Sequence, residues 1–422
     1  MTPSIHTLSN GVRVICDPMP GLETLALSVV AGRGAASEDL ARSGWSHLLE
    51  HMVFKGAGGR SAREIVEAVE SQGGQINAAT GYERTSFQVR ALKGGLPLGM
   101  DILSDLVLRP SLDPADLTKE KSVVAQEIAE AADTPDDLVF ELAQSAAFSE
   151  QPHGRPILGT VKSLRPADSA AIEAWRAALY APDRLVVSAA GAVDEAELLA
   201  LTEAAFGAQP AAEGAPAPLA PVFAPGRAAK LRRLEQAHLV LLLPAFGARD
   251  DDYFALRLFV EMLGGGMSSR LFQEARETRG LAYAIDGWSD TYADAGMLGV
   301  YAGCAAGDAA PLAELTAAQI LDLAQHCGDA ELARAKAQLK AHLFMAREQP
   351  LSRAETAAGQ ALLFGRLFSA AELGDAIDAV SAADIARVGS RLLAPRLAAG
   401  SVLGSKVALG AVEAFSDTLA KG

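Results

Sequence analysis

His47, Glu50 and His51 form an H-x-x-E-H pattern in the segment GWSHLLEHMVFKG. Residues four apart on a helix lie on one face, so the two imidazoles can converge on one cation. Glu50 lies about 100° around the helix from His51, where it can act on a water molecule beside that cation without being a ligand. With 7 His in the chain and Glu at roughly 6% of positions, chance gives this pattern on the order of 0.01 times. The pattern indicates metal-dependent hydrolysis; the alternative is a set of ordinary polar residues on an amphipathic helix.

A catalytic zinc site needs a third protein ligand, and the motif supplies only two. The best candidate is Glu127, which lies 76 residues after His51 in the segment KEKSVVAQEIAE. Glu120 precedes it by two helical turns and therefore lies on nearly the same face. Two glutamates at this spacing are ordinarily solvated helix charges, but beside the histidine pair they become candidates for the metal site.

The helix that carries both glutamates has clear boundary signals. Asp113 can cap its N-terminus, Pro114 suits its first turn, and Thr134-Pro135 ends it. The sequence therefore predicts one continuous helix that carries both glutamates.

The sequence has two halves with the same order of predicted strands and helices, separated by a Pro-rich linker. Residues 207–227 contain five of the 20 Pro and show no apolar periodicity, so they separate residues 1–206 from 228–422. Each half has the order strand, two helices, two strands, two helices, which predicts two homologous α+β domains. The expected elements are strand 25–32, helices 45–54 and 62–73, strands within 75–92, and helices 95–108 and 116–132, then strand 238–246, helices 252–263 and 269–280, strands 281–289 and 296–303, and helices 312–326 and 330–349.

The two copies share apolar positions but not the acidic ones. Aligning Leu117 with Leu332 places Glu120 on Ala335 and Glu127 on His342. This difference is expected if only the first half holds a metal ion.

The composition restricts the class of partner. The chain has 37 Lys+Arg against 52 Asp+Glu, a net charge of −15. Nucleic-acid binding needs a basic surface, so DNA and RNA are disfavoured and cationic ligands fit better. Cys16, Cys304 and Cys327 show no C-x-x-C spacing, which indicates neither a disulfide framework nor a thiolate metal site.

The sequence has no segment typical of export or membrane insertion. Residues 1–20 lack a basic cluster followed by an apolar core, and no apolar run approaches ~18 residues. We therefore expect a cytoplasmic protein without a membrane partner.

Together these residues resemble the pitrilysin/insulinase family of inverzincin zinc metallopeptidases. The resemblance covers nearly the whole chain and includes HLLEH and the two later glutamates. The family's strand near the substrate resembles the segment GGQINAATGYERTSF. The family's glycine-rich segment and Arg-to-Tyr pair resemble the segment LGGGMSSRLFQEARETRGLAYAIDGW. Two domains in one chain of this length are most similar to the short bacterial subfamily related to the mitochondrial processing peptidase β subunit. The resemblance implies two domains with helices packed on mixed sheets, forming a bowl-shaped half of a peptidase chamber.

The resemblance also implies roles for the residues of the first half. His47, His51 and Glu127 would be the ligands of one Zn²⁺ per chain, and Glu50 the general base. Glu120 would be a supporting carboxylate of the catalytic site. Two neutral imidazoles and one carboxylate leave the ion net positive with an open position, as a catalytic zinc requires.

Four further residues would contact substrate. Arg276 and Tyr283 match the family's pair that binds the substrate backbone and stabilises the oxyanion. From the sequence alone, the expectation is an exposed arginine on a helix and a half-buried tyrosine on a strand. Asn77 and Ala78 would lie on an edge strand that pairs with extended substrate, and their alternative is a turn and strand start.

The resemblance therefore implies a zinc endopeptidase acting on peptides or unfolded polypeptide inside a dimeric chamber. One chain carries both the metal residues and the Arg-to-Tyr pair, so a homodimer is sufficient, although the short subfamily also includes heterodimers. The alternative function is a non-catalytic scaffold or binding subunit that keeps the fold without the chemistry.

Overall fold

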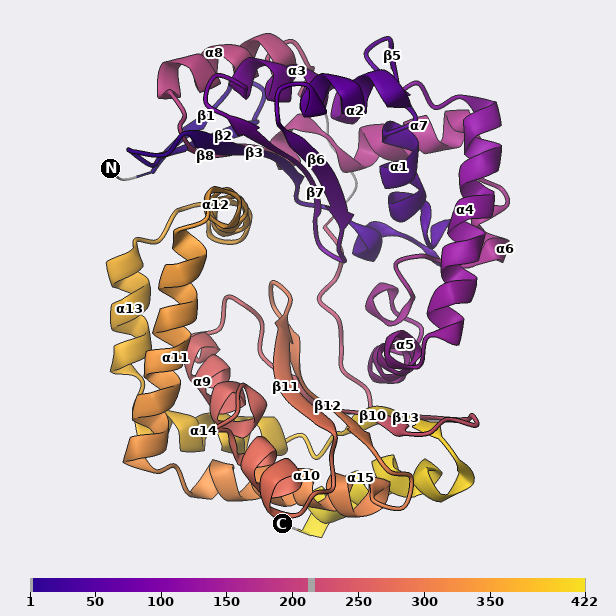
Figure 1. Ribbon diagram of the computed structural model, residues 1–422, viewed down its shortest axis with the longest axis vertical. Coiled ribbons are helices and arrows are strands. Elements are labelled where there is room, and N and C mark those ends of the chain that lie inside the picture. The colour runs from indigo at the N-terminus through magenta and orange to yellow at the C-terminus, as the bar shows by residue number, and fades with distance from the viewer. Residues whose placement is uncertain (1–2, 212–216, 422) are drawn as a thin grey trace. The chain divides into compact units, whose positions relative to one another are not determined.

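The computed structural model describes residues 3–211 and 217–421, and they form two compact units (Figure 1). Unit 1 comprises residues 1–129, 156–219 and 344–369, and unit 2 comprises residues 130–155, 220–343 and 370–422. Each unit takes most of its residues from one half of the chain and one helix from the other half. Residues 212–216 of the predicted linker lie outside the described residues.

Unit 1 is built on a six-stranded mixed sheet with the order β1-β2-β8-β3-β7-β6. β2 and β8 are parallel, and the other neighbours are antiparallel. The strands are β1 (Ser4–Thr7), β2 (Arg13–Pro18), β3 (Thr24–Ala31), β6 (Gln75–Thr80), β7 (Thr85–Leu92) and β8 (Leu185–Gly191), with a separate hairpin of β4 (Gly56–Ala57) and β5 (Arg60–Ser61).

Helices cover both faces of this sheet. The helices of unit 1 are α1 (Trp45–Val53), α2 (Ala62–Glu70), α3 (Leu96–Leu108), α4 (Pro114–Asp133), α6 (Val161–Leu164), α7 (Ser169–Leu179), α8 (Glu195–Phe206) and α12 (Pro350–Phe364). α3 and α8 contact one face, and α12 lies on the opposite face (Figure 1). Successive side chains of β2 point to opposite faces of the sheet, so both faces present apolar residues to helices. Val14 and Cys16 join the core under α3 and α8, while Ile15 packs against the alanines of α12.

α12 comes from the second half of the sequence and is fixed in unit 1 by an ion pair. The Arg353 guanidinium donates from Nε and Nη2 to the carboxylate of Asp17, at 2.6 and 2.5 Å. Asp17 is buried, so the two-pronged geometry compensates a charge that would otherwise be costly to remove from water.

Unit 2 has a five-stranded mixed sheet with the order β11-β12-β10-β13-β9, in which only β13 and β9 are parallel. Its strands are β9 (Gly226–Leu231), β10 (Ala237–Ala245), β11 (Ala284–Thr291), β12 (Gly296–Cys304) and β13 (Ala399–Gly404). Its helices are α5 (Pro135–Ala147), α9 (Tyr253–Gly264), α10 (Ala309–Gln325), α11 (Asp329–Arg347), α13 (Ala370–Ala379), α14 (Ala382–Leu393) and α15 (Ala411–Lys421).

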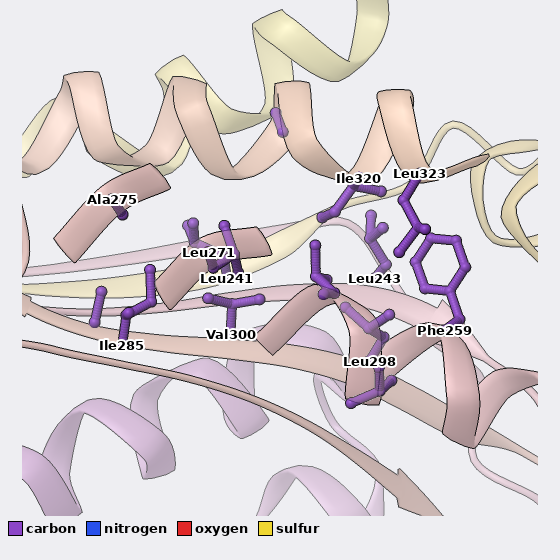
Figure 2. Packing of buried hydrophobic residues seen from close by; sticks show 14 of the residues in the cluster. Leu241, Leu243, Phe259, Leu271, Ala275, Ile285, Leu298, Val300, Ile320 and Leu323 are labelled. Carbon is purple, nitrogen blue, oxygen red and sulfur yellow. The ribbon is translucent and has the colours of Figure 1, made fainter. Parts of the chain in front are cut away.

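The core of unit 2 fills the space between the sheet and its helices. Figure 2 shows Leu243 of β10 beside Leu298 of β12, with Phe259 of α9 nearby, and Leu241 of β10 beside Val300 of β12. α5, from the first half of the sequence, contacts β9, β10 and β13. Both faces of β10 are therefore covered, which explains its nearly continuous run of apolar residues.

The predicted α+β architecture with two similar domains is confirmed, but one of the predicted helices is of a different type. The segment predicted as helix 269–280 is π-helical over Phe272–Thr278 (η5) rather than α-helical. A π-helix has i→i+5 hydrogen bonds and occurs mostly as a single-turn insertion, which is too short for apolar spacing to reveal. Among the described residues, no helix is both long enough and apolar enough to span a bilayer.

Candidate metal centre

α1 places both histidines and Glu50 on the side away from the core. Leu48, Leu49, Met52 and Val53 are fully buried, and they form the apolar stripe that holds the helix against the sheet. His47, Glu50 and His51 are only partly buried, on the remaining face. The predicted helix of residues 45–54 is confirmed to within one residue.

The start of α1 is fixed by a tight turn and a carboxylate. Gly44 has a φ of 89°, a left-handed conformation that glycine adopts without strain, and a Cβ there would lie 2.5 Å from the carbonyl oxygen of Leu158. The Glu38 carboxylate accepts hydrogen bonds from the backbone N–H groups of Gly44 and Ser46, at 2.8 and 2.7 Å. A negative charge at this end stabilises the helix and satisfies its free N–H groups.

α4 presents its two glutamates along one face. Asp113 accepts hydrogen bonds from the N–H groups of Ala115 and Asp116, and the helix ends at Asp133, so the predicted boundaries are confirmed. The buried positions are Leu117, Glu120 and Val124, matched in α11 by Leu332, Ala335 and Leu339. Glu127 follows on the same side and lies at the partly open end of this face.

The side chains of α1 and α4 bring three possible ligand atoms together. Glu127 Oε2 lies 3.9 Å from His47 Nε2 and 3.5 Å from His51 Nε2, and the ligand atoms of the three residues lie within 4.8 Å of one another. These separations are longer than the 2.9–3.0 Å typical of N–H···O hydrogen bonds. The two distances from Glu127, 3.5 and 3.9 Å, are close to the roughly 3.4 Å between two ligand atoms of a tetrahedral zinc with bonds of about 2.1 Å. In the described part of the chain, this is the one group of three with metal-binding geometry.

His47 is held in the neutral form that a metal ligand needs. Burial, followed by the nearby imidazole of His51, lowers the pKa of His47 to about 4. The imidazole is therefore unprotonated at neutral pH, and its lone pair is available. Its Nδ1 is buried without a hydrogen-bond partner, so the ring is placed by packing and by its neighbours.

Glu50 lies beside this group and is oriented by Thr80. The Thr80 Oγ1 hydroxyl donates to Glu50 Oε2 at 2.5 Å. Burial raises the pKa of Glu50, and the hydrogen bond from Thr80 only partly opposes this effect. A carboxylate with a raised pKa is better suited to accept a proton near neutral pH.

Glu120 supports His51 and is itself held by a lysine. Glu120 Oε2 lies 3.1 Å from His51 Nδ1, and Glu120 Oε1 lies 2.8 Å from Lys55 Nζ. A carboxylate on Nδ1 fixes the ring orientation and leaves Nε2 facing Glu127. Glu120 thus has the supporting position expected for it.

The remaining predicted substrate residues lie on β6, on η5 and in the segment just before β11. Asn77 and Ala78 are on β6, which forms an edge of the unit 1 sheet and contacts α1. Arg276 is on η5 of unit 2, stacked 4.8 Å from the ring centroid of Phe272. Tyr283 is 61% exposed just before β11, more open than a half-buried strand tyrosine. Exposure leaves its hydroxyl free to meet a ligand.

Sequence reasoning missed Lys55 and Thr80. Thr80 is two residues beyond Ala78 on the same face of β6, so strand periodicity could have placed it near the site. Lys55 lies four residues after His51, but it follows the end of α1. Helical spacing therefore does not predict the direction of its side chain.

Comparison with known proteins shows the family of the chain. A family model described as Insulinase (Peptidase family M16) matches residues 13–161, and one described as Peptidase M16 inactive domain matches residues 167–339. The chain is 34% identical to an uncharacterized zinc protease of Streptomyces coelicolor, over 92% of this chain and 87% of that protein. It is also 34% identical to the uncharacterized zinc protease YmxG of Bacillus subtilis, over 89% of this chain and 92% of that protein.

A solved structure shares the fold. The crystal structure of a protease from Helicobacter pylori matches with a TM-score of 0.89 at 20% identity, covering 96% of this chain and 99% of that one. The relatives, the family models and the two-domain architecture agree with the resemblance seen in the sequence. The chain therefore belongs to the insulinase (M16) family of peptidases and is of its short bacterial type.

Proposed function

We propose that the chain is a zinc-dependent endopeptidase that hydrolyses peptides or unfolded segments of polypeptide. The observation that carries this proposal is the convergence of His47, His51 and Glu127 within 4.8 Å, with the Glu50 carboxylate beside them. Two imidazoles and one carboxylate are a ligand set of catalytic zinc, which keeps a position open.

In this proposal the residues have separate tasks. A zinc ion held by His47, His51 and Glu127 would polarise a substrate carbonyl and acidify a water molecule. Glu50, oriented by Thr80, accepts a proton from the attacking water and can return it to the leaving amine. The edge of β6 offers unpaired main-chain groups to an extended peptide, which gives affinity with little sequence selection.

A scaffold or binding subunit is the second candidate function. The match of residues 167–339 to an inactive domain favours it, since that stretch contains none of the three ligands. The ligand set and Glu50 in the first half favour catalysis, because a subunit that binds no metal has no physical need of them.

A digest of a mixed peptide pool, with every cleavage site mapped, tests the proposed function. We expect cleavage within peptides, its loss when a chelator removes zinc, and its return when zinc is restored. A zinc-loaded chain that leaves the whole pool intact would instead support the scaffold.

We further propose a homodimer in which Arg276 and Tyr283 of one chain complete the metal site of the other. The metal residues all lie in unit 1 and this pair lies in unit 2, and two-fold pairing would satisfy two sites at once. Mixing inactive Glu50→Gln chains with inactive Tyr283→Phe chains tests this arrangement. Each mixed dimer would contain one intact site, so activity should reappear on subunit exchange. Heterodimers that remain inactive would show that the pair does not act across chains.

A further inference from the structure

Lys55 makes a contact for which the proposed chemistry gives no role. Its Nζ lies 2.8 Å from Oε1 of Glu120, while the other oxygen of that carboxylate lies 3.1 Å from Nδ1 of His51. One carboxylate therefore bridges the lysine and the imidazole. The chain of contacts runs from Lys55 through Glu120 to His51, and from Nε2 of the same ring to Glu127.

Glu120 needs this partner because its carboxylate is nearly inaccessible to water. Its side chain is only 6% exposed, against 35% for Lys55 and 37% for Glu127. A buried carboxylate is costly unless a cation and hydrogen bonds compensate it. The ammonium of Lys55 supplies this compensation with one end still in contact with solvent, as is usual for a long lysine side chain.

The position of Lys55 lets it join the two segments that provide the ligands. It follows the end of α1, and its backbone N–H donates to the carbonyl of Met52 at 3.1 Å. Gly56 and Ala57 then form β4, and Ala57 pairs with Pro110, shortly before α4. The contact between Lys55 and Glu120 thus links the helix of the histidines directly to the helix of Glu127.

We propose that Lys55 is a positioning residue for the metal centre: it fixes the Glu120 carboxylate, which in turn orients the His51 ring. This inference rests on the proposed zinc site and deepens it. Without the ammonium, the carboxylate loses its fixed orientation and Nδ1 of His51 loses a fixed acceptor. Loss of such a supporting contact typically weakens metal affinity by about 10- to 100-fold.

Zinc affinity of the full-length chain, measured by competition with a chromophoric chelator, tests the inference without any peptide substrate. We expect Lys55→Met to bind zinc at least about 10-fold more weakly and Lys55→Arg to recover most of the loss, because arginine keeps a cation beside the carboxylate. Lys119→Met is the matched control: Lys119 lies on α4 next to Glu120, but its side chain is 72% exposed and paired with Asp116. That variant should bind zinc like the unchanged chain.

A double substitution separates positioning from a general effect on the fold. Glu120→Gln should itself weaken zinc affinity by about 10- to 100-fold, and adding Lys55→Met should then cost little more, because both act through one contact. If Lys55→Met does not fold, the same zinc affinities can be compared with Lys55→Gln in its place.

Wild-type zinc affinity in the folded Lys55 variant would overturn the inference, and so would fully additive losses in the double variant. Failure of the unchanged chain to bind zinc would instead count against the proposed function.

Discussion

Glu50→Gln should keep its zinc and lose at least about 100-fold in kcat. Glu50 is not one of the three converging residues, so metal binding does not depend on its charge. Its amide has nearly the shape of the carboxylate and can still accept the hydrogen bond from Thr80, but it cannot accept a proton from water. Zinc content by elemental analysis and single-turnover hydrolysis of one peptide measure the two expectations separately.

The matched control for this change is Glu67→Gln. Glu67 is an exposed carboxylate of α2, paired with Arg63, and its loss should leave zinc content and kcat unchanged. If Glu50→Gln lost zinc but regained turnover when zinc was added, Glu50 would be a ligand rather than a base.

A chain with both His47→Ala and His51→Ala should lose bound zinc and all metal-dependent hydrolysis. The two changes remove two of the three ligands, and the remaining carboxylate is a weak site by itself. Alanine favours helix, and neither imidazole belongs to the apolar core, so α1 should remain folded. Circular dichroism of the metal-free variant checks the fold, and elemental analysis checks the zinc.

His326→Ala provides the control for nonspecific loss of an imidazole. This residue is 71% exposed and paired with Asp322 at the end of α10. The His326→Ala variant should retain one zinc ion per chain. Full zinc occupancy in the double variant would show that the metal binds elsewhere.

The pairing of the two histidines was predictable because it depends on local helical geometry and on a rare motif. Four-residue spacing places His47 and His51 on one face, and the capping signals at Asp113 and Pro114 set the phase of α4. The repeated buried positions of α4 and α11 followed from the same alignment that set Glu127 against His342. Local pattern thus predicted which side chains share a helix face, whereas the meeting of Glu127 with the histidines was implied by the resemblance to the family.

The exchange of α5 and α12 between the two units was not predictable from sequence. An apolar helix face specifies that the helix must be buried, but it does not specify which sheet buries it. The alanines of α12 pack closely on Ile15, Val30 and Val186, and that match depends on three-dimensional shape, as does the ion pair between Arg353 and Asp17. The same reason explains why Lys55 escaped notice, since its partner Glu120 is distant in sequence.

In the proposed site, His47, His51 and Glu127 together hold one zinc ion while Glu50 remains free to take a proton. Anomalous diffraction at the zinc absorption edge, from crystals of the zinc-loaded chain, tests this most directly. We expect one peak per chain, about 2.0–2.2 Å from Nε2 of each histidine and from a carboxylate oxygen of Glu127, with Glu50 beyond bonding distance. A peak at other residues, or one bonded to Glu50 in place of Glu127, would contradict the claim.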